Sequence, residues 1–585
     1  MRMAGRMAGR QLRWASTLAL ACGAAVMLQS CTSPAPRSAA QLTGADPMQK
    51  CAALGQMLSG NAAFPGLVIT SSRWMAQGTE IATRAGKVTD LPDHCVVEGS
   101  FAPHEGRIGG PYRIGFRMRL PGAWNGRYFF QGGGGSNGVV GDATGFNGVG
   151  NPVALVRGYA VIAQDSGHDN DRNTVPDHQG DLVFGYDPRA RANYGHASLK
   201  PVSDLGHLLM NRFYGRDSET NLFWGCSKGG QEGMAFAQRY PDEFDGIVAM
   251  APGMSLPRAA LAEAWDTQAI AGIARARGQA ITIDTMRSLI SPAQYQLVAS
   301  AALKACDALD GTADGIIGAV WQCTTARVQP ELRAAQCRDG SSGACLEPAQ
   351  VDALVKIMDG ARDRTGKPLY APWVWDSGIA ASGWAVWKTG TPQGPPSLNV
   401  VLGAGSLSAV FSSPPTPLSR NADDLLAWQL SFDFDRDSRR IYAVAPPFET
   451  SPWQDVGMRS ANLSAFRAHG GKLIVPHGAS DPVFSLLDTI AWWNEVNARE
   501  RGSASEFARV FPVPGMNHCG GGPATDRFDS LTALEQWVLA GKAPGAIEAK
   551  AGPETPWPGR SMPLCPYPQF AVRGAGGRYS CRLQP

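Results

Sequence analysis

The chain has 585 residues, of which 44% are hydrophobic and 18% charged, and its formal net charge is +3. This composition is typical of a globular protein with a substantial core, and the length is too great for one ordinary domain. The small net charge argues against nucleic acid or an anionic membrane surface as a partner.

The first 31 residues have the features of an export signal. Several arginines precede the apolar run LALACGAAVML, which is too short to span a bilayer. The run ends in LQSC, which resembles a bacterial lipobox with Cys31 as the acylated residue. Cleavage as an ordinary secretory signal is the alternative. We expect an exported protein, secreted or held in the periplasm or outer membrane as a lipoprotein, whose only contact with a membrane would be this anchor.

Ten cysteines remain after the signal, and an even number in an exported chain indicates disulfides. Proximity in sequence suggests four pairs: Cys51–Cys95, Cys306–Cys323, Cys337–Cys345 and Cys565–Cys581. By elimination Cys226 and Cys519 form a fifth, long-range pair, although sequence alone does not fix the connectivity.

From about residue 112 the chain alternates strands and helices, as in α/β proteins. The patterns predict strands in 112–120, 127–131 and 159–164, a helix in 203–214, a strand in 221–225, a helix in 229–240 and a strand in 245–250. The same alternation of strands and helices is found again towards the C-terminus, with a strand in 471–478, a helix in 486–500, a strand in 507–513 and a helix in 530–540. We therefore predict an α/β-hydrolase fold.

Between these two parts the rhythm of strands and helices breaks down in a segment rich in Gly, Pro, Ser and Trp. We interpret this segment as an inserted lid domain. The predicted organisation is a signal peptide in 1–31, the first part of the hydrolase domain in 32–253, the lid in 254–462 and the second part of the hydrolase domain in 463–585.

The stretch GCSKG, residues 225–229, fits the pattern G-x-S-x-G between a predicted strand and a predicted helix. In α/β-hydrolases this context places the serine, here Ser227, on a tight turn with its hydroxyl exposed. An ordinary glycine turn is the alternative. A serine nucleophile needs a histidine base and an acid that orients it, in the chain order Ser, Asp, His. Asp481 and His518 each follow a predicted strand and fit these two roles.

An oxyanion hole requires two donors for the developing negative charge. We predict the backbone N–H of Lys228, directly after the serine, and that of Gly135 in QGGGGSNG, for which a flexible loop is the alternative. We expect the Lys228 side chain to be solvated at the surface. A Cys226–Cys519 disulfide would join the turn that carries Ser227 to the loop that carries His518.

The motifs GCSKGG, HGASD and MNHCGGGPATDRFD resemble those of the tannase and feruloyl esterase family of α/β-hydrolases, and the resemblance covers essentially the whole mature chain. In that family adjacent cysteines bridge the catalytic serine and histidine. The resemblance implies Ser227, Asp481 and His518 as the triad, with the oxyanion hole at Gly135 and Lys228.

The resemblance also implies a structural calcium site in the lid, in CDALDGTADGI. Its ligands would be the carboxylates of Asp307, Asp310 and Asp314 with the carbonyls of Thr312 and Ile316, an oxygen set that suits Ca²⁺ better than zinc. The spacing is not that of an EF-hand, and the residues alone would also fit a solvated acidic turn.

The lid is expected to line the acyl pocket, where Trp387 and Phe484 would pack on an aromatic ring, although aromatic residues are also common in cores. Leu398 occupies the position at which the branch of the family that hydrolyses terephthalate half-esters has an arginine for the free carboxylate. Leu402 and Gly403 replace that branch's aromatic gate and a neighbouring polar residue. Without the arginine, the bidentate hydrogen-bonded ion pair with the substrate carboxylate cannot form.

The sequence thus predicts an exported, monomeric serine carboxylesterase for small esters of aromatic acids such as hydroxycinnamic and gallic acids. Terephthalate half-esters are the alternative substrates. A binding protein without catalysis is a more distant alternative, because such proteins usually lose a member of the triad and all three residues are present here.

Overall fold

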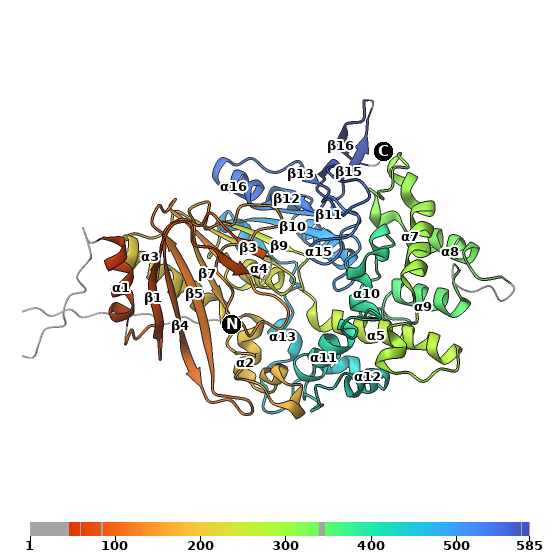
Figure 1. Cartoon of the computed structure of the whole chain (residues 1–585), viewed down its shortest axis with the longest axis horizontal. Coiled ribbons are helices and arrows are strands. Elements are labelled where there is room, and N and C mark those ends of the chain that lie inside the picture. The colour runs from red at the N-terminus through yellow and green to blue at the C-terminus, as the bar shows by residue number, and fades with distance from the viewer. Residues whose placement is uncertain (1–45, 59, 84–85, 339–344, 575, 584–585) are drawn as a thin grey trace, which may run out of the picture. The chain divides into compact units, whose positions relative to one another are not determined.

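A nine-stranded sheet forms the centre of the fold in the computed structural model, which describes residues 46–58, 60–83, 86–338, 345–574 and 576–583 (Figure 1). The strand order is β1-β4-β5-β7-β6-β8-β9-β10-β11, and β6 to β11 run parallel, whereas β1, β4 and β5 are antiparallel. The strands are β1 (Val68–Met75), β4 (His94–His104), β5 (Tyr112–Pro121), β6 (Arg127–Gln131), β7 (Ala160–Gln164), β8 (Thr220–Cys226), β9 (Gly246–Met250), β10 (Lys472–Gly478) and β11 (Ala508–Val513).

The parallel strands are apolar because helices cover both faces of this part of the sheet. Every residue of β7 and β9 is buried, which explains why these strands appear in the sequence as continuous hydrophobic runs. The helices α3 (Leu199–Tyr214), α4 (Lys228–Arg239) and α15 (Leu486–Arg499) connect parallel strands, and α16 (Ser530–Ala540), which follows the last of these strands, packs against β9 and β10. The predicted α/β fold is confirmed, and each strand and helix expected between residue 112 and the end of α16 is present.

Of the antiparallel end of the sheet only β5 was predicted, and β1 and β4 were not. Strand β1 is an edge strand whose residues are all half-buried or exposed, so its sequence lacks the apolar run of a central strand. Helix α1 (Pro47–Leu58) packs beside it, and the Cys51–Cys95 disulfide joins this helix to β4. The signal peptide expected in 1–31, including Cys31, lies outside the described residues.

A helical insertion, residues 251–471, separates β9 from β10, and its described part contains no strand. Its helices α7, α8 and α9 pack against one another, and α9 packs against α5 (Figure 1). The helices are α5 (Leu256–Ala276), α6 (Ile283–Met286), α7 (Pro292–Cys306), α8 (Thr325–Ala334), α9 (Pro348–Met358), α10 (Ser382–Lys388), α11 (Gly405–Ala409), α12 (Ala422–Leu430), α13 (Pro452–Val456) and α14 (Ser464–His469). They bury a hydrophobic core of their own, which meets the large sheet after β10.

Three small sheets complete the fold. Two lie towards the C-terminus: β12 (Arg527–Phe528), β13 (Ile547–Lys550) and β14 (Ser561–Leu564) form one, and β15 (Phe570–Arg573) and β16 (Tyr579–Arg582) form the other. The third pairs β2 (Ile81–Thr83) with β3 (Gly86–Val88). Among the described residues no helix is long and apolar enough to cross a bilayer.

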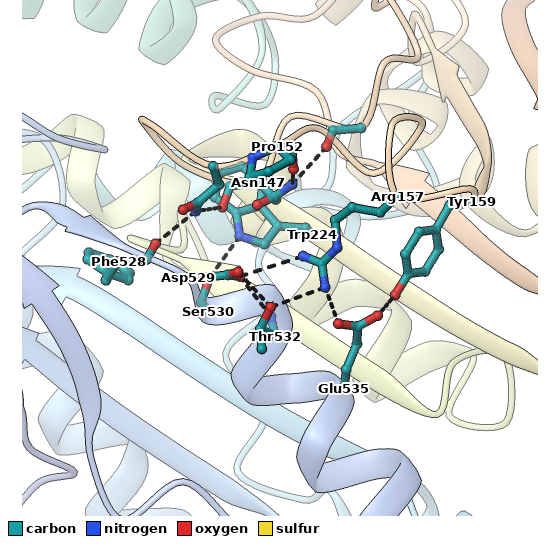
Figure 2. A network of polar contacts seen from close by, with 12 residues as sticks. Asn147, Pro152, Arg157, Tyr159, Trp224, Phe528, Asp529, Ser530, Thr532 and Glu535 are labelled. Atoms are coloured by element: carbon teal, nitrogen blue, oxygen red, sulfur yellow. Dashed lines mark hydrogen bonds and ion pairs between the residues drawn. The ribbon is translucent and has the colours of Figure 1, made fainter. Parts of the chain in front are cut away.

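A polar network ties α16 to the strands of the large sheet (Figure 2). Arg157, which precedes β7, donates a hydrogen bond to Thr532 at 3.1 Å and also pairs with Glu535. Trp224 of β8 donates its indole N–H to the Ser530 hydroxyl at 3.1 Å. The start of α16 is thereby fixed against β8, the strand that leads into Ser227.

Candidate active site

Ser227 lies on a sharp turn between β8 and α4, with a positive φ of 65° and a ψ of −122°, a backbone conformation that residues other than glycine rarely adopt. The glycines on either side allow this turn. A Cβ atom on Gly225 would lie 2.5 Å from the carbonyl of Gly229, and one on Gly229 would lie 2.6 Å from the carbonyl oxygen of Gly133. The strand–turn–helix context expected of a nucleophile motif is therefore present, and only glycine fits two positions before and two positions after the serine.

The structure brings Ser227, His518 and Asp481 together from three separate parts of the chain. The Ser227 hydroxyl lies 2.8 Å from His518 Nε2, and His518 Nδ1 lies 2.8 Å from Asp481 Oδ2. With Nδ1 donating to the carboxylate, Nε2 is free to accept the serine proton. This is the geometry of a general base and its orienting acid.

Asp481 is fully buried, and its second oxygen, Oδ1, accepts the backbone N–H groups of Val483 at 2.8 Å and Phe484 at 3.0 Å. Burial alone would raise the pKa of Asp481, but the charge of His518 and hydrogen bonds from His477 and His518 hold it well below the usual range. The carboxylate therefore stays ionised and can stabilise a protonated His518.

His477 has the supporting position expected of a structural histidine. It is buried, with Nδ1 2.9 Å from the Thr489 hydroxyl and Nε2 3.0 Å from the carbonyl of Phe484. Its Nε2 also lies 3.6 Å from Asp481 Oδ2. Both ring nitrogens of His477 thus have partners other than Ser227.

The glycine loop after β6 and the start of α4 offer the two N–H groups expected for an oxyanion hole. The backbone N–H groups of Gly132, Gly133 and Gly134 donate to Trp224, Glu232 and Asn137, respectively. For the N–H of Gly135 no acceptor exists among the described residues, and the residue has a positive φ of 60°. Lys228 is the first residue of α4, whose N–H has no partner within the helix.

The expectation that the Lys228 side chain is solvated is wrong. It is only 1% exposed, and its ammonium lies 3.0 Å from a carboxylate oxygen of Glu232 and over the ring of Tyr194. Burial lowers the pKa of Lys228, against the effect of the neighbouring Glu232. The side chain points inward because the turn at Ser227 presses the first turn of α4 against the glycine loop.

Glu232 is a residue of the site that the sequence analysis missed. Its carboxylate accepts the backbone N–H of Gly133 at 2.9 Å and the Asn137 side-chain amide at 2.7 Å, besides pairing with Lys228. One buried anion thus holds the glycine loop against α4. The spacing of four residues between Lys228 and Glu232 is the signal that could have revealed the pair.

A cavity of about 630 Å³ opens above Ser227 and His518. All four side chains predicted for the substrate pocket line it: Trp387, Phe484, Leu398 and Leu402. The rings of Trp387 and Phe484 lie edge-on to the His518 imidazole, with centroids 5.9 Å and 5.4 Å away. The walls nearest the base are therefore aromatic and flat, and suit a planar acyl group.

Comparison with known proteins places this geometry in a family. Residues 95–582 match the sequence profile of the tannase and feruloyl esterase family. The chain belongs to this family. It is 40% identical over 560 residues to the mono(2-hydroxyethyl) terephthalate hydrolase of Piscinibacter sakaiensis, with 91% of this chain and 90% of the relative covered. The chain is therefore a carboxylic ester hydrolase of the tannase and feruloyl esterase family.

Two solved structures of low sequence identity share the fold. Feruloyl esterase B of Aspergillus oryzae matches with a TM-score of 0.71 and 21% identity over 92% of this chain and 100% of that one. Tannin acyl hydrolase of Aspergillus niger matches with a TM-score of 0.64 and 19% identity over 89% of this chain and 94% of that one. At these identities the likeness concerns the fold alone.

In this member of the family five disulfides are formed, with the pairing expected from the sequence. Cys226 and Cys519 are bonded across 293 residues, so the neighbours of Ser227 and His518 are covalently joined. The other bonds are Cys51–Cys95, Cys306–Cys323, Cys337–Cys345 and Cys565–Cys581. Such a number of disulfides is typical of exported proteins.

The loop predicted to bind calcium follows α7. Asp310, Thr312, Asp314 and Ile316 line one very small cavity, whereas Asp307 does not line it and accepts the N–H groups of two loop residues instead. Burial, and then the charges of Asp314 and Asp307, raise the pKa of Asp310 to about 6, although backbone N–H groups oppose this. Asp314 also pairs with Arg560 at 2.5 Å.

These contacts fit a calcium ion in part. The donors are all oxygen atoms, and the three carboxylates outnumber the single paired cation. However, nowhere in the described part of the chain do three acidic, histidine or cysteine side chains converge closely enough to hold a metal by themselves. Calcium would therefore require the main-chain carbonyls of Thr312 and Ile316 as well.

Proposed function

We propose that this enzyme hydrolyses esters of hydroxylated aromatic acids, of the hydroxycinnamic or gallic type. The observation that carries the proposal is the hydrogen-bonded chain Ser227–His518–Asp481 at the floor of a cavity with aromatic walls. The cavity is large enough for a single aromatic acyl group and part of an alcohol.

In the proposed mechanism the Ser227 hydroxyl attacks the ester carbonyl and His518 takes its proton. The negative oxygen of the tetrahedral intermediate accepts hydrogen bonds from the N–H groups of Gly135 and Lys228. Collapse breaks the C–O bond to the alcohol, which leaves with the proton from His518. Water then attacks the acyl-enzyme by the same steps and releases the acid. Asp481 stays ionised throughout and stabilises the imidazolium.

The walls of the cavity support a neutral rather than an anionic acyl group. Of the described residues that line it, the only Lys, Arg or His side chains are Lys228, which is paired with Glu232, and His518. Leu398 and Leu402 line it with apolar side chains. A carboxylate on the far end of the substrate would find no free cation there.

Terephthalate half-esters are a second candidate, favoured by the 40% identity to a mono(2-hydroxyethyl) terephthalate hydrolase. The test is a panel of methyl ferulate, methyl gallate and mono(2-hydroxyethyl) terephthalate, compared by kcat/KM in wild type and Leu398→Arg. We expect the hydroxylated esters to be the better substrates of the wild type, and the arginine to raise kcat/KM for the half-ester by about tenfold. A wild type that prefers the half-ester by tenfold or more contradicts the proposal.

We further infer that residues 254–462 form a lid over this cavity, since Trp387, Leu402 and Phe411 of that segment line it. We also propose that a structural Ca²⁺ binds through Asp310, Asp314 and the carbonyls of Thr312 and Ile316, with Asp307 ordering the loop. Its part would be to fix the loop after α7 by neutralising the carboxylates.

We also propose that the protein is exported, that Cys31 is lipidated and that the enzyme is a monomer. The number of disulfides supports export. Labelling of the expressed protein with radioactive palmitate tests the anchor: wild type should be labelled and Cys31→Ala should not, and an unlabelled wild type would contradict lipidation. Sedimentation of the soluble enzyme tests the monomer.

A further inference from the structure

The acyl cavity contains a carboxyl group that the triad does not use. Glu263 lies on α5, and it faces the cavity together with Leu256 and Ala260, which precede it by seven and three residues on the same face of the helix. Its residue exposure is only 6%. A titratable side chain is thus buried in the wall of the site without a part in the chemistry proposed above.

Within the described part of the chain the Glu263 carboxyl has no hydrogen-bond or ion-pair partner, and only the main-chain carbonyl of this residue accepts a hydrogen bond, from the Thr267 hydroxyl. The positive charge that acts on it is that of Lys388, but this ammonium is bound to Asp266 at 2.5 Å. Burial raises the pKa of Glu263 to about 8, while Lys388 lowers and Asp266 raises it. At neutral pH the group is mainly protonated, so it can both donate and accept a hydrogen bond.

The facing wall leaves room for this carboxyl group. A Cβ atom on Gly403 would lie 2.1 Å from Glu263 Oε2, so any larger residue at that position would displace the carboxyl. Ser406, one turn further on, also lines the cavity, and among the described residues its main-chain carbonyl, but not its hydroxyl, is hydrogen-bonded. Two hydrogen-bonding groups without a partner in the described chain therefore border the same cavity, Glu263 on α5 and Ser406 on α11.

Both groups are open to the cavity, so a ligand that fills it removes them from solvent. That ligand avoids the free-energy cost of burying unpaired polar groups only if it supplies the hydrogen bonds itself. The matching group on an aromatic acid is a neutral hydroxyl, which can donate and accept as the protonated carboxyl does. A carboxylate on the ligand fits worse, because it would lie near a group that itself becomes negative as the pH rises.

We propose that Glu263 determines substrate specificity by hydrogen-bonding a phenolic hydroxyl of the acyl group, with Gly403 providing the space and Ser406 a second polar contact. This inference rests on the proposed function, because it requires an aromatic acyl group in the cavity. The feature of the acyl group that the enzyme selects is then the ring hydroxyl.

The experiment compares two pairs of esters that differ only in ring hydroxyls: methyl 4-hydroxycinnamate with methyl cinnamate, and methyl gallate with methyl benzoate. The ratio of kcat/KM within each pair is measured for wild type, Glu263→Leu, Glu263→Gln and Gly403→Ala. Hydrolysis of p-nitrophenyl acetate and the melting temperature show that each variant is folded and has a working triad.

We expect the wild type to prefer the hydroxylated ester of at least one pair by about tenfold or more, as a site built around a hydrogen bond does. Glu263→Leu and Gly403→Ala should abolish that preference, whereas Glu263→Gln, which keeps a donor and an acceptor, should retain about a third of it or more. If Glu263→Leu does not fold, Gly403→Ala tests the same contact with the glutamate still in place.

An unchanged ratio in Glu263→Leu, or in Gly403→Ala if the leucine variant is unfolded, would overturn the inference, because the carboxyl would then have no contact with the hydroxyl. So would an equal loss on both members of a pair, which indicates a structural role alone. Failure of the proposed function has a different signature: the wild type would cleave p-nitrophenyl acetate but none of the four aromatic esters.

Discussion

Cys226 and Cys519 are joined by a disulfide, and each stands directly beside a residue of the hydrogen-bonded pair Ser227 and His518. The bond therefore joins the turn that carries Ser227 covalently to the loop that carries His518. Cys519 also has a left-handed backbone, with φ 63°, so the histidine loop bends sharply at this point. The bond joins residues 293 positions apart in the chain and so helps to hold Ser227 and His518 at the distance that proton transfer requires.

Replacing both cysteines with serine should lower kcat by about tenfold or more with little change in KM, because a displaced base weakens proton transfer rather than substrate binding. Stability should fall by about 2–5 kcal/mol, as for other native disulfides. The measurements are steady-state kinetics and urea unfolding. The matched control is Cys565→Ser/Cys581→Ser, which removes a disulfide remote from Ser227 and should leave kcat within threefold of wild type. Equal kcat losses in the two variants would contradict a positioning role.

Glu232→Gln should lower kcat by about 10- to 100-fold, somewhat less than the loss of a whole oxyanion donor. The amide cannot neutralise the buried Lys228 and cannot accept from Gly133 and Asn137 as an anion does, so the glycine loop shifts. The control is Glu243→Gln, a buried carboxylate that pairs with Lys200 outside the cavity. A Glu232→Gln variant as active as this control would show that the loop holds its position without the carboxylate.

The sequence was sufficient for the central sheet, because buried parallel strands such as β7 and β9 stand out as apolar runs between helices. It was also sufficient for the meeting of Ser227, Asp481 and His518, because chain order and the elements around each residue are constrained by the fold. The Cys226–Cys519 pairing was expected by elimination of the other cysteines, and the position of both residues beside Ser227 and His518 agreed with it. Strand β1 was missed because, as an edge strand, it has no run of buried apolar residues. Helix α1, which packs beside it, was missed as well.

Local sequence patterns could not predict which charged side chains are buried around the site. The side chain of Lys228 was expected in solvent, and only the packing of α4 against the glycine loop shows that it is buried on Glu232. Glu263 stands in an alanine-rich helix that is buried on most sides, so its sequence gives no sign of which face lines a cavity. Tertiary contacts of this kind decide which charged residues are inside.

Glu263→Gln should become more stable relative to wild type as the pH rises. The folded state raises the pKa of Glu263 from 4.5 to about 8, with Lys388, Asp266 and the buried Tyr194 as the titratable groups around it. In that window the folded chain binds a proton that the unfolded chain has lost, so wild-type stability falls from about pH 4.5 to pH 8. Glutamine does not titrate. The melting temperatures of both proteins at about pH 5, 7 and 9 test this, and a difference independent of pH would contradict it.

Removal of calcium should lower the melting temperature of the wild type by several degrees, and added Ca²⁺ but not Mg²⁺ should restore it. Since the loop after α7 does not line the acyl cavity, kcat at low temperature should change by less than threefold. Asp310→Asn, which weakens the proposed site, should respond less to the chelator. A wild-type melting temperature unaffected by prolonged dialysis against chelator would argue against a bound ion.

The most direct test of the central claim, that Ser227 is the nucleophile of a serine esterase, is covalent labelling with diethyl p-nitrophenyl phosphate followed by peptide mass spectrometry. The account predicts one diethylphosphoryl group per chain, on Ser227, formed in parallel with the loss of activity on methyl ferulate. The Ser227→Ala variant should be unlabelled and inactive. Complete inactivation with the label on another residue, or a Ser227→Ala variant that hydrolyses the ester at the wild-type rate, would contradict the account.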